Sequence, residues 1–213
     1  VGFHQLRLML DVVKYNIAIT ECGRSSHWEC ALACLNLMLL SRTSPTMSTL
    51  GAALSSCERS AQWVVALDLL HGSCDLSLEA NAICYNTAIA ACKKGAQWPK
   101  ALKVLRNMST VKLVSDAISF TSAIGACMLG RRPFEAWSLF VDAQRQNVEL
   151  DTICCNVVIS AFGESQWTLA LTMIEKMNDV RICLDRETFN AAAVICGKAA
   201  RWDHALSLLR NAR

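Results

Sequence analysis

The sequence has no hydrophobic run long enough to cross a membrane. Its longest apolar stretch, from Leu32 to Leu40, is interrupted by Asn36, whereas a membrane-spanning helix needs about 20 mostly apolar residues. No secretory signal is visible either, so we expect any targeting peptide to lie upstream of Val1. The sequence therefore predicts no membrane segment.

Side-chain clusters that carry catalysis are also missing. The four histidines share no common spacing, no HxE motif precedes a CxxC pair, and no glycine-rich phosphate loop is present. The histidines are His4, His27, His71 and His204. The sequence thus offers no catalytic residue, no metal ligand and no cofactor site, and we expect a protein that is not an enzyme.

Charge is scarce, since charged residues make up 18% of the chain and hydrophobic residues 53%. Such a composition excludes a disordered chain, which would be poor in apolar residues. The net charge of +3 permits an anionic partner but is far from the basicity of a protein that binds by charge alone.

What the sequence does contain is a repeat. Positions that we call anchors follow one another at intervals of 35 residues four times and then 34, and they are Asn16, Gly51, Asn86, Thr121, Asn156 and Asn190. Cysteine follows five of the six anchors at a distance of six residues, and Phe162 fills the gap. A tryptophan column and an alanine column recur in the same phase. A period of this length indicates a solenoid of short structural repeats.

The repeat period also indicates what the twelve cysteines do. Five of them occupy one column, and equivalent sites in neighbouring repeats should lie about 10 Å apart, beyond the roughly 7 Å that a disulfide allows. Reduced core cysteines are therefore expected. Cys30 and Cys34 are spaced to share one helix face, but without two further ligands we favour packing over metal binding.

Each repeat predicts a hairpin of two helices. In the copy from 82 to 116, apolar residues fall at helical spacing in two runs, and Gly95 between them is available for a left-handed cap. Pro99 suits the first turn of the second helix. The predicted segments are a preceding tail at 1–11, five repeats at 12–46, 47–81, 82–116, 117–151 and 152–185, and a truncated sixth repeat at 186–213.

The first-helix motifs KYNIAITECGR, YNTAIAACKKG and FTSAIGACMLG, with aspartates closing three repeats at Asp116, Asp151 and Asp185, resemble the pentatricopeptide repeat family over essentially the whole chain. The resemblance implies an all-α fold, a right-handed superhelix of helix-turn-helix hairpins. It also implies binding of single-stranded RNA, one base per repeat, in an organelle, either chloroplast or mitochondrion.

In that family the anchor and the residue that closes the same repeat together contact the base. The resemblance implies the pairs Asn16 with Thr46, Gly51 with Asn81, Asn86 with Asp116, Thr121 with Asp151, and Asn156 with Asp185, while Asn190 has no closing partner. Asn with Asp implies uracil and Thr with Asp guanine, so the third to fifth repeats imply U-G-U. Because Asn and Asp also favour helix caps and turns, simple capping is the alternative.

Two further columns accompany these pairs. Three residues before the anchors stand aliphatic side chains that the family uses as wedges between bases, namely Val13, Ile83, Ile118 and Ile153; Ser48 and Glu187 depart from this pattern. Eight residues after the anchors stand basic side chains that could contact phosphates, namely Arg24, Arg59, Lys94 and Lys198. The alternative is that these basic side chains only stabilise the C-terminal ends of the helices through the helix dipole.

Two rival functions stay open at this point. The same hairpins could form a scaffold for protein partners, or the recognition arm of an RNA-processing enzyme whose catalytic domain lies outside this sequence. The anchor and closing residues recurring in phase favour RNA, since a peptide groove gives no reason for that pairing.

Overall fold

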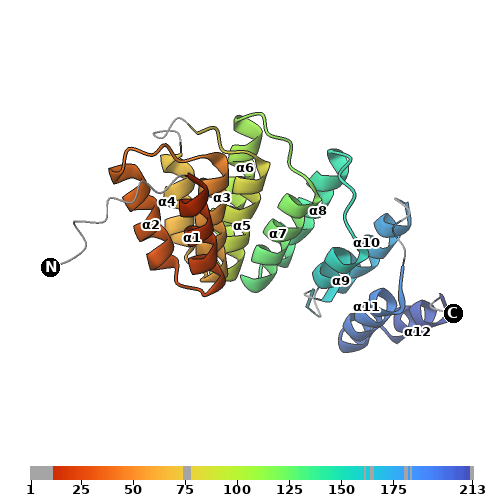
Figure 1. Ribbon diagram of the computed structural model, residues 1–213. Coiled ribbons are helices and arrows are strands. Elements are labelled where there is room, and N and C mark those ends of the chain that lie inside the picture. Colours follow the sequence, from red (N-terminus) through yellow and green to blue (C-terminus); the bar gives the residue numbers. More distant parts are fainter. Residues whose placement is uncertain are drawn as a thin grey trace. The chain divides into compact units, whose positions relative to one another are not determined.

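The computed structural model describes residues 12–73, 78–160, 162–163, 166–179, 182 and 184–211, and in these ranges it contains twelve α-helices and no strand (Figure 1). Two helices fall within each predicted repeat. In chain order they are α1 Val12–Arg24, α2 Trp28–Leu40, α3 Met47–Arg59, α4 Trp63–Gly72, α5 Ala82–Lys94, α6 Trp98–Thr110, α7 Ala117–Leu129, α8 Pro133–Arg145, α9 Thr152–Ser160, α10 Trp167–Asp179, α11 Arg186–Lys198 and α12 Trp202–Asn211. The predicted all-helical repeat fold is confirmed.

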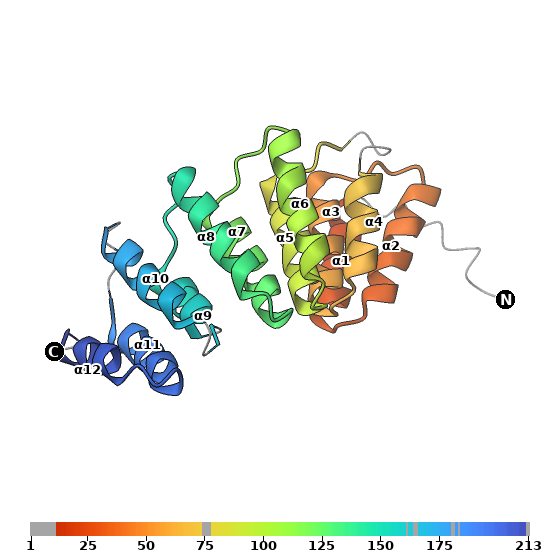
Figure 2. The same ribbon diagram turned by 180° about the vertical axis from the view of Figure 1, so that it is seen from behind.

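The chain divides after Val114 into two compact units. In the first unit, the odd-numbered helices α1, α3 and α5 pack side by side, and each even-numbered helix lies against its own partner (Figures 1 and 2). In the second unit, α7, α9 and α11 pack in the same way, with α8, α10 and α12 against them. No hairpin therefore buries its apolar faces alone.

The alanine and cysteine columns form the tight parts of both cores. Ala31, Ala66, Ala101, Ala136 and Ala170 are fully buried, and a side chain this small lets paired helices approach closely. Cys57, Cys92, Cys127 and Cys196 are likewise buried, and Phe162 takes their place in the fifth repeat. Ala205 lies in α12, where its side chain is outside the described residues.

Two members of the tryptophan column, Trp63 and Trp167, contact the hairpin that follows their own. The Trp63 indole lies over Gly95 of the next hairpin, and the Trp167 ring lies 5.3 Å from the His204 ring and 5.0 Å from the Arg201 guanidinium carbon. These rings thus hold one repeat on the next.

Burial makes four core cysteines poor nucleophiles. It raises the pKa of the Cys57 and Cys92 thiols to about 11, and that of Cys127 and Cys155 to about 12. Only the thiolate reacts. The Cys30 side chain, in contrast, is exposed.

We therefore expect an alkylating reagent at pH 7.5 to modify Cys30 at least about tenfold faster than these four buried thiols. The Cys30 side chain is accessible to the reagent, whereas burial and a raised pKa leave little reachable thiolate at the other four. Peptide mass spectrometry of timed samples measures the site-specific rates. A Cys30→Ser variant should lose the fast phase, and rapid modification of Cys127 in the folded protein would contradict the expectation.

The turn between the two helices of a hairpin corrects one sequence expectation. Gly95 is not the left-handed residue, since its φ is −79° and that of Ala96 is +53°. The Ala96 N–H donates to the Lys93 carbonyl and the Gln97 N–H to the Cys92 carbonyl, at 3.0 and 2.8 Å, which is a Schellman cap. Ser26, Ala61, Arg131 and Ala200 occupy the same left-handed position in other hairpins.

Packing explains why glycine stands one residue earlier than the cap requires. A Cβ at Gly95 would overlap the Trp63 indole of the preceding hairpin, so the small residue is needed for contact between repeats. The left-handed site beside it carries a Cβ, at a cost of about 1 kcal/mol.

Two single substitutions, one at Gly95 and one at Ala96, test these two roles separately. Ala96→Gly should raise the free energy of unfolding by about 1 kcal/mol, because the left-handed conformation loses its steric cost. Gly95→Ala should lower it by about 1–3 kcal/mol, because the indole must move. Urea denaturation followed by circular dichroism measures both, and equal effects of the two variants would refute the assignment of roles.

Candidate functional site

A stripe of exposed and half-buried positions runs along each first helix. Positions spaced by four, three and four residues lie on the same side of a helix, and in α1 these are Val13, Ile17, Thr20 and Arg24, all exposed. The predicted wedge residues are all well exposed, at 63% for Val13, 69% for Ile83, 64% for Ile118 and 72% for Ile153. A large aliphatic side chain exposed at the same place in four repeats indicates a surface available for apolar contact.

The residues that close the repeats all cap the following first helix. Their side-chain oxygens accept a hydrogen bond from the backbone N–H of the third helical residue, which we call the N3 residue. Donor–acceptor distances are 3.4 Å at Thr46, 3.1 Å at Asn81, and 2.8 Å at Asp116, Asp151 and Asp185. Capping is thus part of what these residues do, and by itself it does not indicate base recognition.

The Asn156–Asp185 pair goes beyond capping. The Asn156 amide nitrogen donates to the two Asp185 carboxylate oxygens at 3.1 and 3.4 Å, across 29 positions of sequence. Asn156 is buried and Asp185 exposed. This contact joins the anchor and closing residue of one repeat directly.

A third residue completes this cluster, and the sequence reasoning missed it. The hydroxyl of Thr188, the N3 residue of α11, lies 2.7 Å from Asn156 Oδ1 and 2.8 Å from Asp185 Oδ1. A hydroxyl recurring three residues after a closing residue was the signal that could have revealed it.

The cluster keeps Asp185 ionised. Hydrogen bonds from the backbone N–H and the hydroxyl of Thr188, with further donation from Asn156, hold the pKa of Asp185 below its ordinary value. These bonds favour the carboxylate. Their contribution to stability is therefore present above the unfolded-state pKa of Asp and is lost as the pH falls through the lowered folded-state pKa.

In the first repeat the link between anchor and closing residue is indirect. Thr49 Oγ1 donates to Asn16 Oδ1 at 2.6 Å and lies 3.1 Å from Thr46 Oγ1. The N3 residue therefore stands between the two residues that were predicted to act as a pair.

The remaining pairs are placed as follows. Asn86 is buried on α5 in the first unit, and Asp116 lies at the start of the second unit, where it caps α7. Thr121 is half-buried, and in the described part of the chain its hydroxyl makes no hydrogen bond with Asp151.

The second and sixth repeats lack a complete pair. A Cβ at Gly51 would meet no described residue of another element within 4 Å, so the anchor site there is open. Its closing residue Asn81 is exposed and caps α5. Asn190 is exposed on α11.

A hollow of about 380 Å³ surrounds the fifth anchor. Ile153 and Glu187, which occupy the wedge position of successive repeats, line it together with Asn156, Val157, Ser160 and Met128. It is an open concavity whose lining combines apolar side chains with the Asn156 amide, the Ser160 hydroxyl and the Glu187 carboxylate.

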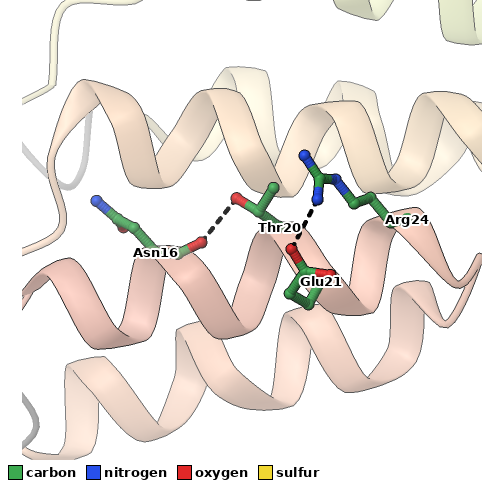
Figure 3. Close-up of polar contacts among 4 residues, drawn as sticks. All are labelled: Asn16, Thr20, Glu21 and Arg24. Carbon is green, nitrogen blue, oxygen red and sulfur yellow. Dashed lines mark hydrogen bonds and ion pairs between the residues drawn. The ribbon is translucent and has the colours of Figure 1, made fainter.

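Two of the predicted phosphate contacts are already engaged in ion pairs. The Arg24 guanidinium lies 3.0 Å from a Glu21 carboxylate oxygen on α1, as Figure 3 shows beside the bond from the Thr20 hydroxyl to the Asn16 carbonyl. The Lys94 ammonium lies 2.7 Å from Glu58 of the preceding hairpin. A phosphate would compete with these carboxylates. Arg59 and Lys198 are exposed.

Other site classes find little support. Among the described residues, no three His, Cys, Asp or Glu side chains are grouped to hold a metal ion. None of the helices in the described ranges combines the length and apolar character that a membrane crossing requires.

Family models match two parts of the chain. A pentatricopeptide repeat domain model matches residues 138–199, and a PPR repeat model matches residues 83–111. No curated protein matches the sequence.

Solved structures with the same fold align with nearly all of this chain. The pentatricopeptide repeat protein PPR10 from maize is 20% identical, with a TM-score of 0.72 over 93% of this chain and 29% of its own. In the structure of PPR10 in complex with an 18-nt psaJ RNA element, the identity is 18% and the TM-score is 0.69, over 95% of this chain and 33% of that chain. This chain therefore spans about a third of the maize protein.

Two proteins from Arabidopsis thaliana are also similar. The PPR domain of protein-only RNase P 1, in complex with tRNA, is 8% identical with a TM-score of 0.72 over 86% of this chain and 97% of that domain. Nuclear proteinaceous RNase P 2 is 10% identical, with 0.69 over 86% of this chain and 41% of its own. At these identities the likeness shows the fold.

Proposed function

Because this chain belongs to the pentatricopeptide repeat family, we propose that it binds single-stranded RNA and recognises one base with each complete repeat. The strand lies along the exposed stripe of the first helices. The aliphatic wedge residues stack against the faces of successive bases, and the anchors contact the base edges.

The observation that carries this proposal is the environment of Asn156. Its amide is held by Asp185 and Thr188 at a hollow that Ile153 lines. An amide nitrogen carries two protons and an amide oxygen two lone pairs, so one donor and one acceptor remain after these bonds. They can meet the edge of a base that is stacked on Ile153.

The proposed sequence preference is U-G-U for the third to fifth repeats, with the 5′ end of the RNA toward the N-terminus. It rests on the family's assignment of Asn with Asp to uracil and Thr with Asp to guanine, applied to Asn86, Thr121 and Asn156 with their closing aspartates. Asn16 with Thr46 fits a pyrimidine more loosely, and Gly51 offers no side chain.

We place this activity in the processing, stability or translation of organellar transcripts. The protein would act without catalysis, by occupying a site on the RNA, shielding it from nucleases or recruiting protein partners. The compartment follows the family's usual location, although one structural relative is nuclear.

The test is binding of the purified chain to short labelled RNAs that contain U-G-U, U-A-U or A-C-A, by fluorescence anisotropy at one moderate salt concentration. One good base contact discriminates by about 1–3 kcal/mol, so U-G-U should bind about tenfold more tightly than U-A-U. Salt-sensitive binding without preference would retain RNA contact but refute the base assignments. No binding to any RNA would favour the protein-scaffold function.

A further inference from the structure

The N3 residue touches the anchor amide in both repeats where the structure gives the contact. Thr49 Oγ1 lies 2.6 Å from Asn16 Oδ1, and Thr188 Oγ1 lies 2.7 Å from Asn156 Oδ1. Each threonine belongs to the helix after the hairpin that carries the anchor. The two contacts therefore form the same arrangement in two separate units of the chain.

Donor and acceptor counting fixes the direction of these bonds. The Asp185 carboxylate only accepts, so the Asn156 side that faces it must be the NH2 group, and the carbonyl oxygen must face Thr188. The single proton of the Thr188 hydroxyl is then shared between that oxygen and Asp185 Oδ1, at 2.7 and 2.8 Å, and Asn156 Oδ1 is an acceptor in this bond. In the first repeat no carboxylate is present, since Thr46 closes it, and the Thr49 hydroxyl is the group that defines where Asn16 Oδ1 lies.

We infer that the hydroxyl of the N3 residue is a positioning group that fixes which way the preceding anchor asparagine presents its amide to the base, a specificity role that rests on the proposed RNA binding. Thr188 does this together with Asp185, and Thr49 does it for Asn16.

The sequence of this chain follows the same rule. Each asparagine anchor that has a following repeat is succeeded, 32 or 33 residues later, by a hydroxyl, as in Asn16 with Thr49, Asn86 with Ser119 and Asn156 with Thr188. The two other anchors, Gly51 and Thr121, have no amide to orient, and the N3 residues after them are Cys84 and Cys154. A thiol is only a weak hydrogen-bond donor.

A fixed amide matters because uracil and cytosine differ by an exchange of donor and acceptor. Uracil offers a carbonyl oxygen and an N–H where cytosine offers an amino group and a bare ring nitrogen. Rotating an asparagine amide by 180° exchanges its own donor and acceptor. An anchor held in one orientation therefore favours one pyrimidine, whereas a freely rotating one accepts both.

The test replaces Thr188 by valine, which keeps the shape and removes the hydroxyl, and by serine, which restores it. Anisotropy with U-G-U and U-G-C RNAs measures discrimination opposite Asn156. We expect about tenfold preference for uracil in the wild type and Thr188→Ser, falling to about threefold in Thr188→Val, where Asp185 alone still holds the NH2 group. Discrimination between U-G-U and U-A-U should stay unchanged in all three, because it depends on Thr121.

A second measurement needs no RNA. In two-dimensional ¹H–¹⁵N spectra of the free protein, the side-chain NH2 protons of Asn156 should exchange slowly with water in the wild type and Thr188→Ser, and at least about tenfold faster in Thr188→Val. Loss of affinity for every RNA to the same degree, with the uracil preference and the Asn156 exchange rate retained, would show a purely structural role and overturn the inference.

The matched control is Cys154→Thr, which adds the same hydroxyl behind an anchor without an amide, and it should leave all base preferences unchanged. Failure of the proposed function is separable from failure of the inference. If no RNA binds, the exchange rates still decide whether Thr188 holds the amide. If RNA binds with base preference but Thr188→Val changes neither the uracil preference nor the exchange rate of the Asn156 NH2 protons, the inference alone is wrong.

Discussion

Replacing Thr121 by asparagine should move the preferred RNA of this protein from U-G-U to U-U-U. In the wild type we expect U-G-U to bind about tenfold more tightly than U-U-U, and in Thr121→Asn we expect that ratio to invert, because one edge contact supplies about 1–3 kcal/mol of discrimination. Thr121 is half-buried on α7 and Asp151 remains in place to close the repeat. Competition binding with the two RNAs measures the ratio.

The control is Ser122→Asn, one residue further along the same helix. Successive helical residues point about 100° apart, so this amide does not take the place of Thr121. Threonine, serine and asparagine have similar helix propensities, and both variants should unfold at the wild-type urea concentration. A ratio that moves equally in both variants, or in neither, is incompatible with Thr121 as the base contact of the fourth repeat.

Gly51→Asn combined with Cys84→Thr should give the second repeat a base contact that it lacks. The space at Gly51 is open, and Cys84 holds the position that Thr49 and Thr188 occupy beside other asparagine anchors. We expect RNAs with a pyrimidine opposite this repeat to bind about tenfold more tightly than to the wild type, with little change for purines. Anisotropy with RNAs that differ only at that base measures the gain.

Gly51→Ala separates base contact from helix stabilisation. Either substitution removes a glycine from the middle of α3 and should raise the free energy of unfolding by about 0.5–1 kcal/mol. Only asparagine can contact a base edge. If Gly51→Ala raises affinity as much as the double variant does, the gain comes from the stiffer helix, and the assignment of Gly51 to the anchor column fails.

Much of the fold was accessible from the sequence because the repeat supplies its own alignment. The spacing of the anchors located the hairpins, and the alanine and cysteine columns located core positions that the structure buries completely at Ala66 and Cys92. The wedge column could be identified only through the family resemblance. Ile83 and Ile153 are exposed, and their role between bases stays a prediction.

What escaped prediction depends on contacts between successive hairpins. The role of Gly95 was wrong because the indole that excludes a Cβ there belongs to Trp63, in the preceding repeat. The part played by Thr188 was missed because its partner Asn156 is 32 residues away, and spacing within one repeat cannot show which side chains of the next repeat lie beside it. Distances across the hairpin boundary were required.

The proposed double use of the closing residues, as helix caps and as base contacts, has a consequence for how such a protein changes over time. Each of Thr46, Asn81, Asp116, Asp151 and Asp185 caps the next helix, and loss of a cap costs about 1 kcal/mol. Selection for a new target and selection for a stable array therefore act on the same side chain. Substitutions among Asp, Asn, Ser and Thr can alter the base while keeping the helix start, whereas other residues would weaken the neighbouring repeat. The variety of RNA sequences open to this architecture is limited by the small set of amino acids that begin helices well.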